Sequence, residues 1–109
     1  MPKSTLQKNV SIIHQASGQL KVLADATRLN LLLSLAEGPK DVMSLSRELG
    51  LAQPAISHHL GLLRMNGLCR NTRDGKRVIY ALSDSVSRTR DGVCIAAGLN
   101  IQLGYPAAA

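Results

Sequence analysis

A chain of 109 residues is long enough for one domain and too short for several. Its 13 Lys and Arg against 7 Asp and Glu give a net charge of +6, which favours a polyanion as partner. The chain has two Tyr and no Phe or Trp, so it lacks the aromatic platforms on which single-stranded nucleic acid stacks. Duplex DNA is therefore the favoured target. No local nucleophile motif, glycine-rich phosphate loop or zincin spacing occurs, which argues against an enzyme.

No apolar run approaches the length needed to span a bilayer, and the N-terminus lacks the continuous apolar core of a signal peptide. Two cysteines are too few for a disulfide framework. We therefore expect a cytoplasmic protein that has no membrane partner.

The first 23 residues carry the signals of a helix. Ser4 and Gln7 lie three residues apart, as in a capping box, and apolar residues continue at helical spacing to Leu20. Gly18 costs about 1 kcal/mol inside a helix, so we expect a bend or break before residues 21–23. A second helix should follow, with Asp25 as its N-cap and Gly38 and Pro39 at its end.

Residues 41–66 predict a helix-turn-helix. Asp41 begins the first helix, and Gly50 stands where a left-handed C-cap belongs. The second helix has a buried stripe formed by Ile56, Leu60 and Leu63. Its opposite side carries Pro54, Ser57, His58 and Gly61. Short hydrogen-bonding side chains on a protruding helix suit the major groove of DNA, which is about 12 Å wide.

Residues 68–82 predict a basic hairpin directly after this helix, which is the position of a wing. Two short runs with strand character flank an Asp-Gly pair, a strong hairpin signal. Arg73, Lys76 and Arg77 lie at the tip, where they would meet phosphates or a minor groove.

Residues 84–103 keep helical spacing of apolar side chains, which predicts a last helix capped by Asp84, although Gly92 and Gly98 weaken it. The Ala-rich residues 104–109 are expected to form a flexible tail.

The chain resembles the ArsR/SmtB family of dimeric winged-helix repressors over about residues 20–82. The likeness lies in ADATRLNLLLSLAEG, then LSRELGLAQPAISHHLGLLRMNGL, then RDGKRVIYAL. It implies a single mainly α (α+β) winged helix-turn-helix domain over residues 1–109, with about five helices and a two-stranded β-hairpin wing. It also implies a homodimer formed by terminal helices 1–23 and 84–103, and two recognition helices in successive major grooves of a pseudo-palindromic operator.

The resemblance also implies residue roles. Gln53, Ser57 and His58 match positions that touch bases or nearby phosphates, and His59 matches an inward-facing histidine. Ala52 departs from the usual Ser or Thr cap of the recognition helix. The residues expected to contact DNA are Gln53, Pro54, Ser57, His58, Arg64, Arg73, Lys76 and Arg77. Alternatives without DNA contact remain open for some of them. His58 would then be an ordinary exposed side chain, Arg64 would pair with a carboxylate, and the wing tip would only be solvated.

The metal sites of the family are not matched. Residues 41–44 lack the Cys-x-Cys of members that bind thiophilic metals, and Asp84 lacks its partner ligands because other residues stand at 86, 97 and 100. We expect no metal and no cofactor; His14 with Cys94 would form at most a weak site.

Two alternative functions remain. One is a thiol-based redox-sensing repressor that uses Cys69 or Cys94, although both are most simply small apolar residues. The other is a winged-helix protein-interaction module that has lost DNA binding.

Overall fold

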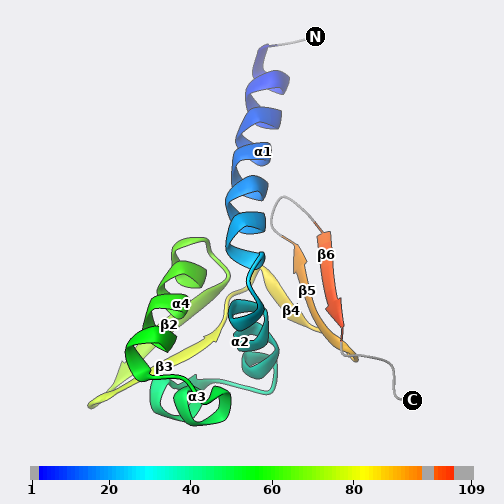
Figure 1. Ribbon diagram of the computed structural model, residues 1–109. Coiled ribbons are helices and arrows are strands. Elements are labelled where there is room, and N and C mark those ends of the chain that lie inside the picture. Colours follow the sequence, from blue (N-terminus) through cyan, green and yellow to red (C-terminus); the bar gives the residue numbers. More distant parts are fainter. Residues whose placement is uncertain (1–2, 97–99, 105–109) are drawn as a thin grey trace.

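The computed structural model describes residues 3–96 and 100–104, which form four helices and two three-stranded antiparallel sheets (Figure 1). The helices are α1 (Lys3–Leu23), α2 (Ala26–Ala36), α3 (Val42–Leu49) and α4 (Gln53–Met65). The strands are β1 (Lys40–Asp41), β2 (Cys69–Asp74), β3 (Arg77–Leu82), β4 (Val86–Arg88), β5 (Gly92–Ala96) and β6 (Asn100–Gly104). No helix within these residues is both long and apolar enough to cross a membrane.

The first helix, α1, passes through Gly18 without a break, and Figure 1 shows it as a straight rod. The expectation of a bend or break there is wrong because packing outweighs the helix propensity of glycine. A Cβ at Gly18 would lie 3.3 Å from Oδ1 of Asn66, so the small residue lets α1 approach the end of α4. Next to it, the buried Gln19 donates a hydrogen bond to the Asn66 carbonyl at 3.3 Å.

The helix-turn-helix forms as the sequence predicts. Asp25 caps α2 by accepting from the Arg28 amide at 3.0 Å, and Asp41 caps α3 by accepting from the Ser44 amide at 2.7 Å. Gly50 adopts the left-handed conformation (φ 68°) that ends α3. The helices enclose a leucine-rich core whose largest fully buried side chains include Leu31, Leu32, Leu45, Ile56, Leu60 and Leu63.

The wing has three strands instead of the expected two, in the order β1-β3-β2. The hairpin itself is confirmed: β2 pairs with β3 from Cys69↔Leu82 to Asp74↔Arg77, and Gly75 (φ 63°) turns the chain. The two-residue strand β1 adds to the far edge of β3, where Asp41 pairs with Ile79. This pairing fixes the base of the wing against the start of α3.

The expected last helix over residues 84–103 is wrong, and with it the count of about five helices. The chain forms β4, β5 and β6 instead, in that order in a second sheet. Val93 and Ile95 are buried on one face of β5 while Cys94 between them is half-buried, the alternation of a strand. Gly92 allows close pairing, because a Cβ there would lie 1.9 Å from the Leu103 carbonyl oxygen.

The residues at the two ends of this sheet also differ from the expected structure. The carboxylate of Asp84 is fully exposed and pairs with Arg70 at 3.3 Å, so it caps no helix. Of the tail expected over 104–109, Gly104 ends β6 and the rest lies outside the described residues, as do residues 97–99. In Figure 1, α1 projects from the body, with the wing and α4 on one side of α2 and the second sheet on the other.

Candidate nucleic-acid interface

The second helix of the helix-turn-helix, α4, presents its polar side to solvent. Ile56, Leu60 and Leu63 are completely buried against the core, so the side of the helix opposite this stripe faces outward. Ala52 precedes the helix without a side-chain cap, as expected from its missing hydroxyl. Each residue predicted to contact DNA is exposed: Gln53, Pro54, Ser57, His58, Arg64, Arg73, Lys76 and Arg77.

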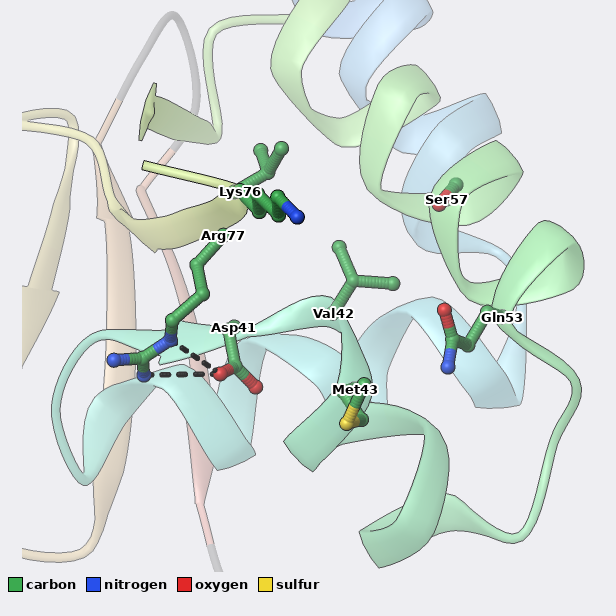
Figure 2. Close-up of a pocket in the computed structure, with 8 residues that line it drawn as sticks. Asp41, Val42, Met43, Gln53, Ser57, Lys76 and Arg77 are labelled. Carbon is green, nitrogen blue, oxygen red and sulfur yellow. Dashed lines mark hydrogen bonds and ion pairs between the residues drawn. The ribbon is translucent and has the colours of Figure 1, made fainter. Parts of the chain in front are cut away.

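A groove of about 520 Å³ separates α4 from the wing (Figure 2), and we call it the wing groove. It is lined by Asp41, Val42, Met43, Gln53, Ser57, Lys76, Arg77 and Val78. Half of the predicted contact residues thus meet in one place, with Gln53 and Ser57 on one wall and Lys76 and Arg77 on the other. Pro54, His58, Arg64 and Arg73 lie outside this lining.

An ion pair fastens the wing to the helix-turn-helix at one side of this groove. Nε and Nη2 of Arg77 each lie 2.9 Å from Oδ2 of Asp41 (Figure 2). Hydrogen bonds from the Ser44 side chain and amide, followed by the Arg77 guanidinium, lower the pKa of Asp41 to about 2. Sequence reasoning missed Asp41 as an interface residue. The two partners are 36 residues apart, and only the pairing of β1 with β3 brings them together.

The other basic residues predicted to contact DNA are not held by ion pairs to any described carboxylate. Within the described part of the chain, Arg64, Arg73 and Lys76 form no ion pair with a carboxylate. The reading in which Arg64 pairs with an acid is therefore not supported. Cations with solvated head groups are suited to polyanion binding, since a phosphate need not displace an existing partner.

The two neighbouring histidines of α4 have different surroundings. His58 is exposed, whereas His59 points inward and is half-buried, as expected. Nδ1 of His59 lies 3.1 Å from Nη1 of Arg28 and 3.9 Å from a carboxylate oxygen of Asp25. His59 therefore contributes to the packing of α4 on α2, and His58 is the histidine available to a ligand.

The environment of Cys69 does not favour redox chemistry. Its side chain is 3% exposed and its thiol donates to the Leu60 carbonyl at 3.6 Å. Burial raises the pKa of this thiol to about 12, although the nearby charge of Arg64 acts in the opposite direction. Cys94 lies on β5 and is half-buried. Among the described residues, no three His, Cys, Asp or Glu side chains gather as a set able to hold a metal ion.

Comparison with known proteins gives a consistent family. Residues 25–70 match the family described as "Bacterial regulatory protein, arsR family". The "HTH-type transcriptional regulator KmtR" of Mycobacterium tuberculosis is 42% identical over 64 residues, which are 59% of this chain and 49% of that protein. The chain thus spans about half the length of this relative. The "Biofilm growth-associated repressor" of Xylella fastidiosa (strain Temecula1) is 31% identical over 85 residues, covering 78% of this chain and 75% of that protein.

Solved structures agree with this assignment. A homodimeric winged helix-turn-helix DNA-binding domain from Mycobacterium bovis, Mb0332, described as a possible ArsR-family transcriptional regulator, superposes with a TM-score of 0.65. It is 29% identical, and the match covers 67% of this chain and 68% of that one.

Proposed function

The chain belongs to the ArsR family of bacterial regulatory proteins, and from this premise we propose that it is a transcriptional repressor that binds duplex DNA as a homodimer. The observation that carries the proposal is the wing groove, where the polar side of α4 meets a cation of the wing. Relatives named as regulators and repressors support the same reading. Such a protein acts in the cytoplasm, where bacterial DNA lies, and we assign it no catalytic activity.

The exposed residues divide into two roles. Gln53, Ser57 and His58 stand on the outer side of α4, and we assign them to base edges in the major groove. Pro54 lies between them in the first turn of α4. Arg64, Arg73 and Lys76 are assigned to phosphates, which position the protein on the duplex without reading sequence.

The homodimer is supported by the apolar stripe of α1, formed by Val10, Ile13 and Leu20. These side chains are 53%, 64% and 46% exposed, and their spacing of three and seven residues places them on one face of the helix. Ala16, Gln19 and Val22 face the body instead. A second copy of α1 would cover the stripe, as in a coiled-coil seam.

The second sheet takes the place of the helix that was expected to complete the dimer interface. An apolar groove of about 290 Å³ adjoins the stripe at Leu20 and passes between α2 and the strands β5 and β6. It is lined by Leu20, Leu23, Ala24, Leu29, Ile95, Ile101, Gln102 and Leu103. We assign this groove to the same dimer contact because it continues the stripe.

Selection of bound duplexes from a random pool tests the proposed function. We expect a pseudo-palindromic consensus with half-sites one helical turn apart. Affinity for that operator should fall steeply with salt, with a log–log slope of about −0.9 for each phosphate neutralised. Recovery of no consensus, together with binding that ignores salt, would favour the protein-interaction module.

Sedimentation of the full chain tests the dimer contact. The substitution Ile13→Lys should convert the dimer to a monomer by placing a charge in the apolar stripe. Gln15→Lys adds the same charge to an exposed position on the opposite side of α1 and should leave the dimer intact. If both variants remain dimers, or if both become monomers, the stripe is not the specific contact.

A further inference from the structure

The acidic residue of the wing groove needs an explanation, because a carboxylate beside a DNA phosphate is repulsive on its own. We propose that Asp41 is a positioning residue of the DNA interface, which holds the Arg77 guanidinium so that its remaining N–H groups bind one backbone phosphate. The inference rests on the proposed function and deepens it. It changes the role of Arg77 from a mobile cation at the wing tip to an oriented contact.

The carboxylate is fixed independently of Arg77. Asp41 caps α3 through the Ser44 amide, and its backbone pairs with Ile79 of the wing. Its side chain is only 14% exposed. The acceptor that Arg77 meets is therefore part of the rigid helix-turn-helix and not a loose surface group.

The guanidinium is anchored on one side and open on the other. Arg77 directs Nε and Nη2 to a single carboxylate oxygen, while its side chain as a whole is 63% exposed. A guanidinium carries five N–H donors in a planar fork. Because the pair with Asp41 uses two of them, the other three remain for an acceptor outside the protein, and a phosphate with several oxygens suits such a fork.

The position of Arg77 relative to other groove residues indicates which acceptor is in reach. Lys76 precedes it in the chain and lines the same groove, opposite Gln53 and Ser57 of α4. When α4 lies in a major groove, the wall formed by the wing faces the bordering backbone. A phosphate there would meet Lys76 as a point charge and Arg77 as an oriented donor.

The direction in which one substitution changes DNA affinity distinguishes a positioning role from simple repulsion. Asp41→Asn keeps an N-cap, since Asn and Asp cap helices about equally well, but it removes the charge that holds Arg77. If Asp41 only repelled DNA, the variant would bind every duplex more tightly. If Asp41 positions Arg77, we expect operator affinity to fall about fivefold to tenfold, with a salt slope shallower by about 0.9 per subunit.

A matched control is available on the same wing. Asp74→Asn changes the net charge by the same amount and leaves an Asn-Gly turn, which suits the hairpin. Asp74 has no ion pair among the described residues. We expect this variant to bind the operator and random duplexes as tightly as the wild type or more tightly.

The experiment measures fluorescence anisotropy of the homodimer of this chain with the selected operator and a random duplex over a series of salt concentrations. Arg77→Ala should reproduce the loss, and Asp41→Asn/Arg77→Ala should add nothing further, because both remove the same contact. Asp41→Ser, which also retains a cap, should behave like Asp41→Asn.

Two failures are distinguishable. If the wild type binds no duplex, the proposed function and this inference both fall. If the wild type binds its operator but Asp41→Asn binds it equally well or more tightly, only the positioning role is overturned. Additive losses in the double variant would likewise overturn it.

Discussion

Nη1 of Arg28 lies 3.1 Å from Nδ1 of His59 and so connects α2 to α4. A guanidinium only donates hydrogen bonds, so Nδ1 is the acceptor in this contact. Nε of Arg28 also donates to the Val22 carbonyl at the end of α1. One side chain therefore joins three helices, including the one that we assign to the major groove.

The first prediction separates the two histidines. His59→Ala should lower the free energy of unfolding by about 1 to 2 kcal/mol, because it removes a partly buried hydrogen bond and packed ring atoms. His58→Ala should stay within about 0.5 kcal/mol of the wild type, as expected for an exposed position. Urea denaturation measures both. Similar losses for the two variants would contradict the assignment of His59 to the interior.

The second prediction separates base contacts from phosphate contacts. Gln53→Ala and His58→Ala should relax sequence preference, with about 1 to 3 kcal/mol lost at a contacted base pair. Lys76→Ala and Arg73→Ala should instead weaken operator and random duplexes alike and make the salt slope shallower by about 0.9 for each phosphate. Competition binding with single-base operator variants measures the difference. Equal effects of all four substitutions on both duplexes would refute the two roles.

The third prediction concerns the thiol of Cys69. Because its pKa is about 12, the fraction present as thiolate at pH 8 should be about one part in ten thousand. In a Cys94→Ala background, we expect an aromatic disulfide reagent to label Cys69 only after unfolding, and mild peroxide to leave operator binding unchanged. Rapid labelling of the native dimer, accompanied by loss of DNA binding, would revive the redox-sensing alternative.

Local signals predicted the helix-turn-helix because each signal acts within a few residues. The caps at Asp25 and Asp41 and the left-handed Gly50 satisfy groups in their own turns, so distant structure does not alter them. The hairpin around Gly75 is local for the same reason. Family resemblance covered this same stretch and added the expected roles of single residues and the homodimer.

The structure of residues 84–103 could not be predicted because their apolar pattern fits two periods. The spacing between Val86, Val93 and Ile101 fits the period of a helix. The two-residue spacing from Val93 to Ile95, and again from Ile101 to Leu103, also fits a strand. The close approach of Gly92 to the backbone of Leu103, eleven residues ahead on the next strand, selects the sheet. The Asp41–Arg77 pair was hidden for a related reason, since it depends on the register of two strands distant in sequence.

The fourth prediction tests this second sheet. Gly92→Ala should destabilise it, because the new Cβ would lie 1.9 Å from a backbone oxygen that cannot move freely, and we expect a loss of about 1 to 3 kcal/mol. Gly61→Ala is the matched control: it lies within α4, nothing beyond the neighbouring backbone of that helix lies within 4 Å of the added Cβ, and the variant should stabilise the fold by up to about 1 kcal/mol. Hydrogen exchange at residues 100–104 and urea denaturation measure both. If Gly92→Ala left this protection intact, the β5–β6 pairing would be wrong.

The last prediction follows from the lowered pKa of Asp41. Its carboxyl titrates at about 2 in the folded chain, against an ordinary value of 3.8. A depressed pKa means that the charged form stabilises the fold, that this contribution is fully present above about pH 4, and that it is lost as pH falls from there toward 2. Asp41→Asn keeps the cap without titrating, so the difference in unfolding free energy between wild type and variant should be constant from about pH 7 to 5 and shrink below pH 4. Urea denaturation of both proteins across this range measures it. A difference that does not change with pH would mean that the charge of Asp41, and hence its pairing with Arg77, contributes nothing to the folded state.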